Sequence, residues 1–376
     1  VITLDSANAM TGAVSITHTG AANVAIDNGT TVLDLGTVSV GQNFQATSGG
    51  GITDTGVITV AGDATFVTDV NDIDINLNSS NAITGALTFT TQTGGSNGAD
   101  ITLNNGSTAI SLATFVTEGN LTLTTTNTSA FDVKAHTVNG DLAISTGGDI
   151  TQTGNLTVTG TSSFTSSGTD NDITLSGTNV LTGAISATTA GTTGNVTIDN
   201  GTTAINLGTV TARGNLSVTG GNGITDSGVI TVAGTSLFHS DVTAKAITLD
   251  SVNAMTGAVS ITHTGAANVA IDNGTTALNL GTVGVGQNFQ ATSGGVISNS
   301  GVITVAGNAT FITDVNDIDI DLDNAANAIT GTINITTQTN AATNGADVTI
   351  DNGTTAINLG TVTARGNLSV RGGAGI

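Results

Sequence analysis

The chain has 376 residues, of which 52 are Gly, and it contains no Pro, Cys, Trp or Tyr. Its apolar residues make up 38% of the chain but aromatic residues only 2%, which is typical of a narrow core lined by Val, Ile, Leu and Ala. Five basic residues against 27 acidic ones give a net charge of −22, which excludes a protein that neutralises nucleic-acid phosphates or binds an anionic membrane surface. No apolar run approaches the roughly 20 residues of a membrane-spanning helix.

Three landmarks recur along the chain. The first has the pattern Asn-Ala/Val-Met/Ile/Leu-Thr-Gly, beginning at Asn8, Asn81, Asn179, Asn253 and Asn327. The second is Asn-Gly at Asn28, Asn105, Asn200, Asn273 and Asn352, and the third is Phe66, Phe164, Phe238 and Phe311. Their spacing predicts units of about 74 residues that begin near 8, 81, 179, 253 and 327. One unit is longer by about 24 residues, around Gly119–Thr146.

Residues 1–77 and 246–322 are near copies, offset by 245 residues and differing at about a dozen positions. Such identity indicates recent duplication, which is natural in a long repetitive protein.

Short strands are expected about every ten residues, for example at 23–26, 56–60, 72–77, 194–198 and 214–218. Apolar and polar residues alternate in them with period two, and helix formers are scarce; Glu118 is the single glutamate. The repetition favours a solenoid over a sandwich. We therefore predict an all-β, right-handed parallel β-helix, continuous over 1–376, with about 19 coils of roughly 20 residues. The lack of Pro fits this fold, because Pro would remove a donor from the strand ladder.

Each landmark has an expected place in the solenoid. The four phenylalanines are predicted to fill the core. Equivalent residues are expected to recur after whole numbers of coils, so the four should lie on one side of the body. The alternative is an exposed aromatic platform for sugars. The Asn-Gly pairs are predicted to form corners between sheets, because both residues tolerate positive φ.

Several segments resemble the repeats of filamentous-haemagglutinin-type exoproteins, bacterial β-helices exported by two-partner secretion or autotransport. They are 140–151 (GDLAISTGGDIT), 154–160 (GNLTVTG) and 214–220 (GNLSVTG). The resemblance covers essentially the whole chain and implies a secreted β-helix on the bacterial cell surface. The amino-terminal secretion domain of that family is not evident in the sequence.

The acidic residues include one cluster that could form a binding site. Asp317, Asp319, Asp321 and Asp323 alternate with apolar residues, and their counterpart is Asp69, Asp72 and Asp74. Clustered oxygens suit calcium, so these four aspartates are the calcium candidates, against the alternative of a solvated acidic stripe. Residues 220–226 (GGNGITD) narrowly miss the calcium-roll pattern. No catalytic residue and no cofactor are predicted, since no basic residue lies near these aspartates in sequence. The histidines are expected at the surface.

The leading hypothesis is a structural or adhesive extracellular fibre, not an enzyme. The alternative is a β-helix module that binds polysaccharide or calcium, and the weaker alternative is a polysaccharide-active enzyme. Interrupted rows of Thr, as at 121–125, also leave an ice-binding surface as a minor alternative. We expect end-to-end self-association or continuation in a longer chain, a cell-surface or polysaccharide ligand, no nucleic acid and no membrane insertion.

Overall fold

The computed structural model describes residues 1–92, 98–240, 244–263, 265–338 and 345–373. In these residues the chain forms 45 strands and no helix, and hence no helix that could span a membrane. The strands stack in parallel as a β-solenoid of about 17 turns, which confirms the predicted fold class. The expected 19 coils is too high, because 376 residues over about 17 turns give about 22 residues a turn. Two compact units are present, unit 1 (Val1–Gly183) and unit 2 (Ala184–Ile376).

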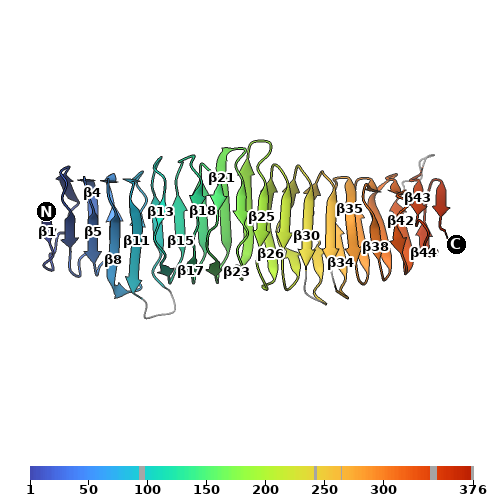
Figure 1. Ribbon diagram of the computed structural model, residues 1–376, viewed down its shortest axis with the longest axis horizontal. Helices are drawn as coiled ribbons and strands as arrows, with labels where there is room; N and C mark the ends of the chain where they lie inside the picture. The colour runs from blue at the N-terminus through green and yellow to red at the C-terminus, as the bar shows by residue number, and fades with distance from the viewer. Residues whose placement is uncertain (93–97, 241–243, 264, 339–344, 374–376) are drawn as a thin grey trace. The chain divides into compact units, whose positions relative to one another are not determined.

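Unit 1 has two opposing sets of strands, which Figure 1 shows standing side by side from β1 to β23. The first set is β1 (Ile2–Leu4), β3 (Val24–Asp27), β5 (Phe44–Ser48), β8 (Ala64–Asn71), β11 (Ala86–Gln92) and β13 (Ser111–Leu112), followed by β14 (Val116–Thr117), β17 (His136–Val138), β20 (Leu156–Val158) and β23 (Val180–Leu181), and by β16 (Phe131–Asp132), β19 (Ile150–Thr151) and β22 (Ile173–Leu175). The second set is β2 (Val14–His18), β4 (Leu33–Val40), β6 (Ile52–Asp54), β7 (Ile58–Val60), β9 (Ile75–Leu77), β10 (Ala82–Ile83), β12 (Ile101–Asn104), β15 (Leu121–Thr124), β18 (Leu142–Thr146) and β21 (Ser162–Thr169).

Unit 2 is built in the same way. One set is β25 (Val196–Asp199), β27 (Leu216–Thr219), β30 (Ser236–Ser240), β33 (Val259–His263), β35 (Leu278–Val285), β37 (Ile297–Asn299), β38 (Ile303–Val305), β40 (Ile320–Leu322), β41 (Ala328–Ile329), β43 (Val348–Asp351) and β45 (Leu368–Arg371). The opposing set is β24 (Ala184–Ala190), β26 (Ile205–Ala212), β28 (Ile224–Asp226), β29 (Ile230–Val232), β31 (Ile247–Leu249), β32 (Ala254–Met255), β34 (Val269–Asp272), β36 (Phe289–Ser293), β39 (Ala309–Asn316), β42 (Thr332–Gln338) and β44 (Asn358–Thr363).

The core of each unit consists of inward columns of like residues. In unit 1 the parallel register places Leu77, Leu103, Leu123, Ile144 and Phe164 above one another, one per turn. All five are at most 2% exposed, while the intervening residues face outward. Branched side chains stacked on one another at strand spacing exclude water from a narrow interior, which the period-two alternation predicted.

The predicted core role of Phe66, Phe164, Phe238 and Phe311 is confirmed, since all four are 0% exposed. Their expected placement on one side is wrong. The register carries Phe238 through Ile261 and Val283 to Ile303 in three turns. Phe311 lies eight residues beyond Ile303, in β39 of the opposing set. A unit of about 74 residues thus spans about three and a half turns, so equivalent residues alternate between opposite faces.

The longer unit contains one added turn, as its length predicted. Within residues 119–146, β15 pairs with β12 on one edge and with β18 on the other. Leu121 lies opposite Leu142, a turn of 21 residues. An insertion of a whole turn leaves every neighbouring strand with a partner, so it preserves the backbone hydrogen bonding of the stack.

Candidate functional site

The five Asn-Gly pairs form corners in which the Asn side chain is fully enclosed. Asn28, Asn105, Asn200, Asn273 and Asn352 are all 0% exposed. The glycines that follow have φ between 55° and 57°. The predicted turn is confirmed, but only the glycine adopts the left-handed conformation; the asparagines do not.

Four of these asparagines, Asn28, Asn105, Asn273 and Asn352, bind the backbone of the adjacent turn. Asn28 accepts a hydrogen bond at Oδ1 from the Met10 N–H (2.8 Å) and donates from Nδ2 to the carbonyls of Met10 (3.0 Å) and Val32 (2.8 Å). The same pairing joins Asn105 to Ile83, Asn273 to Met255 and Asn352 to Ile329. The partners are the third residue of the first landmark. Two motifs that looked independent in the sequence are therefore one lock between turns.

Four of the asparagines that open the first landmark are buried too, namely Asn81, Asn179, Asn253 and Asn327, whereas Asn8 is half-buried. Asn81 accepts a hydrogen bond from the Ile58 N–H (2.8 Å) and donates to the Asp54 carboxylate (2.7 Å). Asn253 repeats both bonds with Ile230 and Asp226. The position of Asp54 and Asp226 is occupied by Gln152 and Asn299 in the other copies, and each of these also bonds to its landmark asparagine. The copies that begin at Asn81, Asn179, Asn253 and Asn327 thus keep a polar pair at this corner, whereas Asn8 bonds only to the carbonyls of Leu4 and Asp27.

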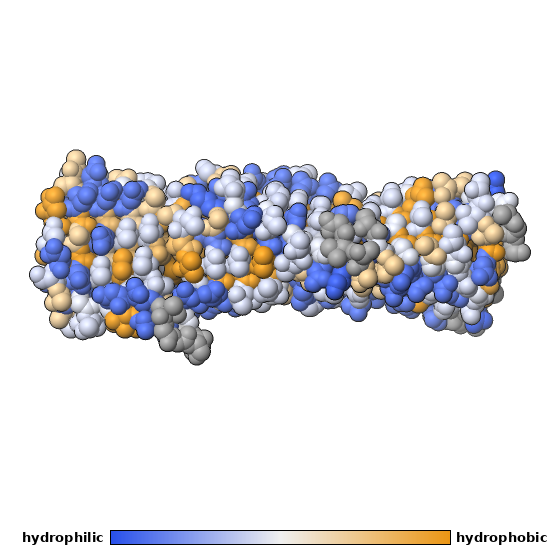
Figure 2. All heavy atoms as spheres, turned by 60° about the horizontal axis from the view of Figure 1, so that its bottom comes forward, coloured by the Kyte–Doolittle hydropathy of each residue, from blue (hydrophilic) through white to orange (hydrophobic). Residues whose placement is uncertain are grey.

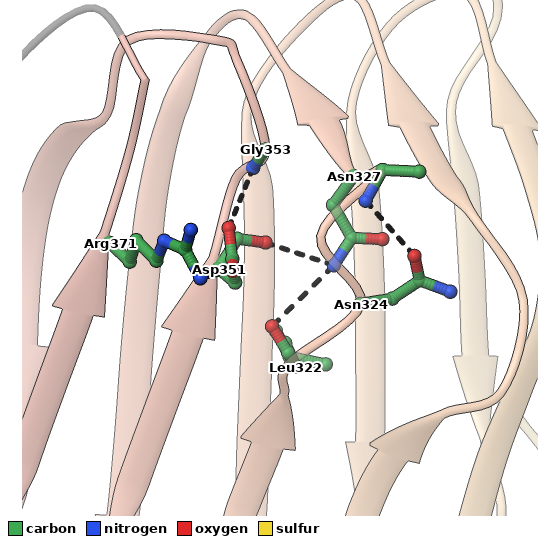
Figure 3. A network of polar contacts seen from close by, with 7 residues as sticks. Leu322, Asn324, Asn327, Asp351, Gly353 and Arg371 are labelled. Carbon is green, nitrogen blue, oxygen red and sulfur yellow. Dashed lines mark hydrogen bonds and ion pairs between the residues drawn. The ribbon is translucent and has the colours of Figure 1, made fainter.

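Figure 3 shows how the two motifs meet near the end of unit 2. The Asn327 Nδ2 donates to the carbonyls of Asp351 (3.1 Å) and Leu322 (3.5 Å). The Asp351 carboxylate in turn accepts from the Gly353 N–H (2.9 Å) and faces the Arg371 guanidinium at 3.5 Å. Arg371 is largely exposed, so this ion pair adds little stability beside the buried amide bonds.

A polar hollow of about 520 Å³ lies on the surface of unit 1. Its acidic residues are Asp72, Asp74, Asp100 and Glu118, and its other lining residues are Gly98, Gly119, Asn120, Asn139 and Gly140. A ladder of side-chain acceptors runs along it: the Asp74 carboxylate accepts from the Asp100 N–H (2.9 Å), and the Asp100 carboxylate accepts from the Asn120 N–H (2.7 Å). The carboxylates of Asp74 and Asp100 therefore hold successive turns together through hydrogen bonds to the backbone.

Unit 2 has a counterpart of about 540 Å³, lined by Asp317, Asp319, Asp347, Arg365, Asn367, Gly345 and Gly366. The ladder recurs, since Asp319 accepts from the Asp347 N–H (2.8 Å) and Asp347 from the Asn367 N–H (2.6 Å). The structure brings Arg365 beside aspartates that lie about 46 residues earlier in the chain, which the sequence analysis missed. Aligning 117–121 (TEGNL) with 364–368 (ARGNL) would have placed Arg365 in the position of Glu118.

The four calcium candidates are only partly brought together. Asp319, Asp321 and Asp323 are exposed and alternate with buried Ile320 and Leu322, as predicted. Asp317 instead has φ of 59° and precedes the strand, and it lines the hollow with Asp319. Partial burial raises the pKa of Asp321, and the carboxylates of Asp323 and Asp319 raise it further. In the part of the chain that the structure describes, no three acidic or histidine side chains form a group able to hold a metal ion.

Two of the four histidines are not at the surface, which corrects the sequence analysis. His136 and His263 are each 4% exposed. The His136 ring nitrogens face the carbonyl oxygens of Val133 (2.7 Å) and Ala113 (3.1 Å), and its ring contacts Phe115 edge-on. His136 thereby ends a column of aromatic rings that begins at Phe44, so a core position is filled by an imidazole. Neighbouring carbonyl oxygens make that burial tolerable.

The described residues place no row of aromatic side chains at the surface. Figure 2 shows one face on which apolar and polar residues are mixed. The exposed large apolar side chains of the described residues are all Val or Leu, such as Val57, Val116 and Val252. An aromatic sugar platform, one of the predicted alternatives, therefore has no support in the described surface.

Comparison with known proteins places the chain among repeat proteins. A family model described as repeats of unknown function (DUF5649) matches residues 21–90, 118–188, 193–262 and 266–336, which is more than half of the chain. Neither the search of curated proteins nor that of solved structures gave a match.

Proposed function

We propose that this chain, which belongs to the DUF5649 repeat family, is part of an extracellular structural or adhesive fibre on a bacterial cell surface. The observation that supports this most is the recurrent burial of asparagine side chains between turns. Residues that a binding site would present to a ligand are used here to join one turn to the next. Such a construction favours mechanical continuity along the stack.

The energetics of the locks agree with a mechanical role. Asn28 and Asn273, for example, each make three donor contacts and one acceptor bond in a fully buried site, where satisfied polar groups are strongly held. The same lock is present at Asn28 and Asn105 in unit 1 and at Asn273 and Asn352 in unit 2. Stability of a solenoid is close to a sum over neighbouring turns, so a lock that recurs protects against opening at many points.

Secretion and adhesion are inferred from the sequence. The resemblance to haemagglutinin-type repeats implies export, and a charge of −22 keeps a long polar body soluble and separate from its neighbours. Antibodies raised against the purified chain should label intact cells of the bacterium that encodes it, and external protease should remove the label. Label that appears only after lysis would contradict the proposal.

We also propose that the stack is extended by further turns. A parallel stack can take up a further turn without losing the pairing of the turns beside it, as the added turn within residues 119–146 illustrates. Electron microscopy of material released from cells should show filaments; isolated particles the size of one copy would argue against extension.

The hollow beside Arg365 favours one second candidate, the binding of a neutral polysaccharide. The Arg365 guanidinium can donate hydrogen bonds to sugar hydroxyls, and the aspartates around it can accept hydrogen bonds from them. The equivalent hollow of unit 1 has Glu118 in place of Arg365 and lacks that donor.

Calorimetric titration with a neutral oligosaccharide such as cellohexaose tests this candidate. Binding should be lost in Arg365→Gln and kept in Arg213→Gln, a matched change in another hollow of unit 2. Equal loss in both variants, or no heat with the unmodified chain, would remove the candidate.

A further inference from the structure

Asparagine followed by glycine is a chemically labile pair. The glycine backbone nitrogen attacks the asparagine Cγ, an N–Cγ bond forms, the Cγ–Nδ2 bond breaks, and ammonia leaves with the proton from the glycine nitrogen. Water then opens the cyclic imide to aspartate or isoaspartate. The first step needs a side chain free to turn toward the backbone. Among the residues that the structure describes there are seven such pairs, at Asn28, Asn105, Asn139, Asn200, Asn222, Asn273 and Asn352.

The five corner pairs are protected. In Asn105, for example, Oδ1 accepts from the Ile83 N–H (3.0 Å) and Nδ2 donates to the Ile83 carbonyl (3.0 Å). The attacking nitrogen is also engaged, because the Gly106 N–H donates to the Asn104 side chain (3.0 Å). The side chain of Asn105 is 0% exposed, so the water required for the second step is absent too. Reaction at these corners needs prior local opening of the stack.

The sixth pair, Asn139–Gly140, is exposed but held. The Asn139 Nδ2 donates to the Glu118 carboxylate (2.6 Å), and the Gly140 N–H donates to the Gly119 carbonyl (2.9 Å). Both the electrophile and the nucleophile are thus held in hydrogen bonds, and both bonds join neighbouring turns.

The seventh pair differs from all the others. Asn222 is exposed, and its side chain makes no hydrogen bond with the described residues. The pair lies just before β28, where the near-equivalent segment of unit 1 reads Gly49-Gly50-Gly51. Gly51 and Gly223 share a φ of 96°, so the two turns have the same shape although the turn in unit 2 contains an asparagine.

From this contrast we infer that Asn222–Gly223 is a self-modification site, at which the folded chain deamidates spontaneously. The reaction converts a neutral amide into a carboxylate on an exposed turn, where water can solvate the new charge. The isoaspartyl form adds one main-chain atom ahead of β28, which pairs with both β26 and β31, and so loosens unit 2 locally.

Peptide mapping by mass spectrometry tests the inference. The intact chain is incubated at mildly alkaline pH, and a second sample is incubated in denaturant. In the folded sample the peptide with Asn222 should gain one mass unit at least about tenfold faster than peptides with Asn105 or Asn273, equivalent to about 1.4 kcal/mol of protection. In denaturant the three rates should converge.

Two variants sharpen the result. Asn222→Ser removes the amide, so the mass shift at 222 should disappear while the corner peptides are unchanged. Asn273→Ser removes the amide that closes one corner. Modification should then become faster only at sites close to that corner. Equal rates at Asn222 and Asn105 in the folded chain, or a stable amide at Asn222 under conditions that modify the denatured chain, would overturn the inference.

Discussion

Replacement of Asn273, the corner asparagine that follows β34, is expected to destabilise unit 2 strongly. Asn273 accepts a hydrogen bond from the Met255 N–H (2.9 Å) and donates to the carbonyls of Met255 (3.0 Å), Thr276 (3.2 Å) and Ala277 (2.9 Å). Asn273→Ala leaves one buried donor and several acceptors without partners. A single unsatisfied buried group costs about 1–3 kcal/mol, so we expect a loss of about 3 kcal/mol in the free energy of unfolding.

Urea denaturation followed by circular dichroism measures the change, and hydrogen exchange shows where it acts. Exchange should accelerate first at Met255 and in β34, because those are the groups the side chain holds. The matched control is Asn222→Ala, an exposed asparagine whose replacement should change stability by less than about 0.5 kcal/mol. A loss below about 1 kcal/mol for Asn273→Ala, or exchange that is uniform over unit 2, would refute the lock.

Three other changes test separate features. Ala244 has φ of 65° at a turn where other copies have Asp, so Ala244→Gly should stabilise the fold by about 1 kcal/mol in thermal unfolding; a loss would show that the side chain matters more than the backbone. The Cβ of Gly140→Ala would lie 2.5 Å from the Asn120 Oδ1 and 2.6 Å from the Gly119 backbone, so a loss of about 1–3 kcal/mol is expected, and an unchanged melting temperature would contradict the close approach. Burial lowers the pKa of His136 despite its two carbonyl neighbours, so its neutral form is favoured in the fold. The stability it contributes is present above the unfolded pKa of about 6.5 and is lost as pH falls below it, toward the lowered folded value. His136→Phe should remove that part of the pH dependence in unfolding curves measured from pH 7 to 5, and an identical slope in both proteins would count against it.

The residues differ in how far their roles could be predicted from the sequence. The phenylalanines were assigned to the core because large apolar side chains at a fixed phase need an interior, and this holds. Their alternation between faces was missed, because the number of residues per turn depends on how long each corner is. If each turn is one or two residues longer or shorter, the number of turns in one repeat unit changes from a whole number, three or four, to three and a half.

Arg365 and the histidines show a second limit of prediction from the sequence. Their neighbours come from adjacent turns, so local composition around them carries no signal. His136 looks like an isolated polar residue in the sequence, yet its ring lies on Phe115 of the preceding turn. Arg365 becomes informative once the repeats are aligned to one another, since Glu118 then marks the same position in unit 1.

The sequence by itself determined the fold class, the repeat and the inward residues, because alternation of branched apolar and polar side chains is a local property of each strand. It also determined the corners, since glycine is the residue that adopts φ near 55° without strain. Only the tertiary structure decided what the asparagines do. Their partners lie 18 to 28 residues away, on the turn above or below. Which residue meets which across that gap depends on the register between turns, and register is a property of the whole stack rather than of any segment in it.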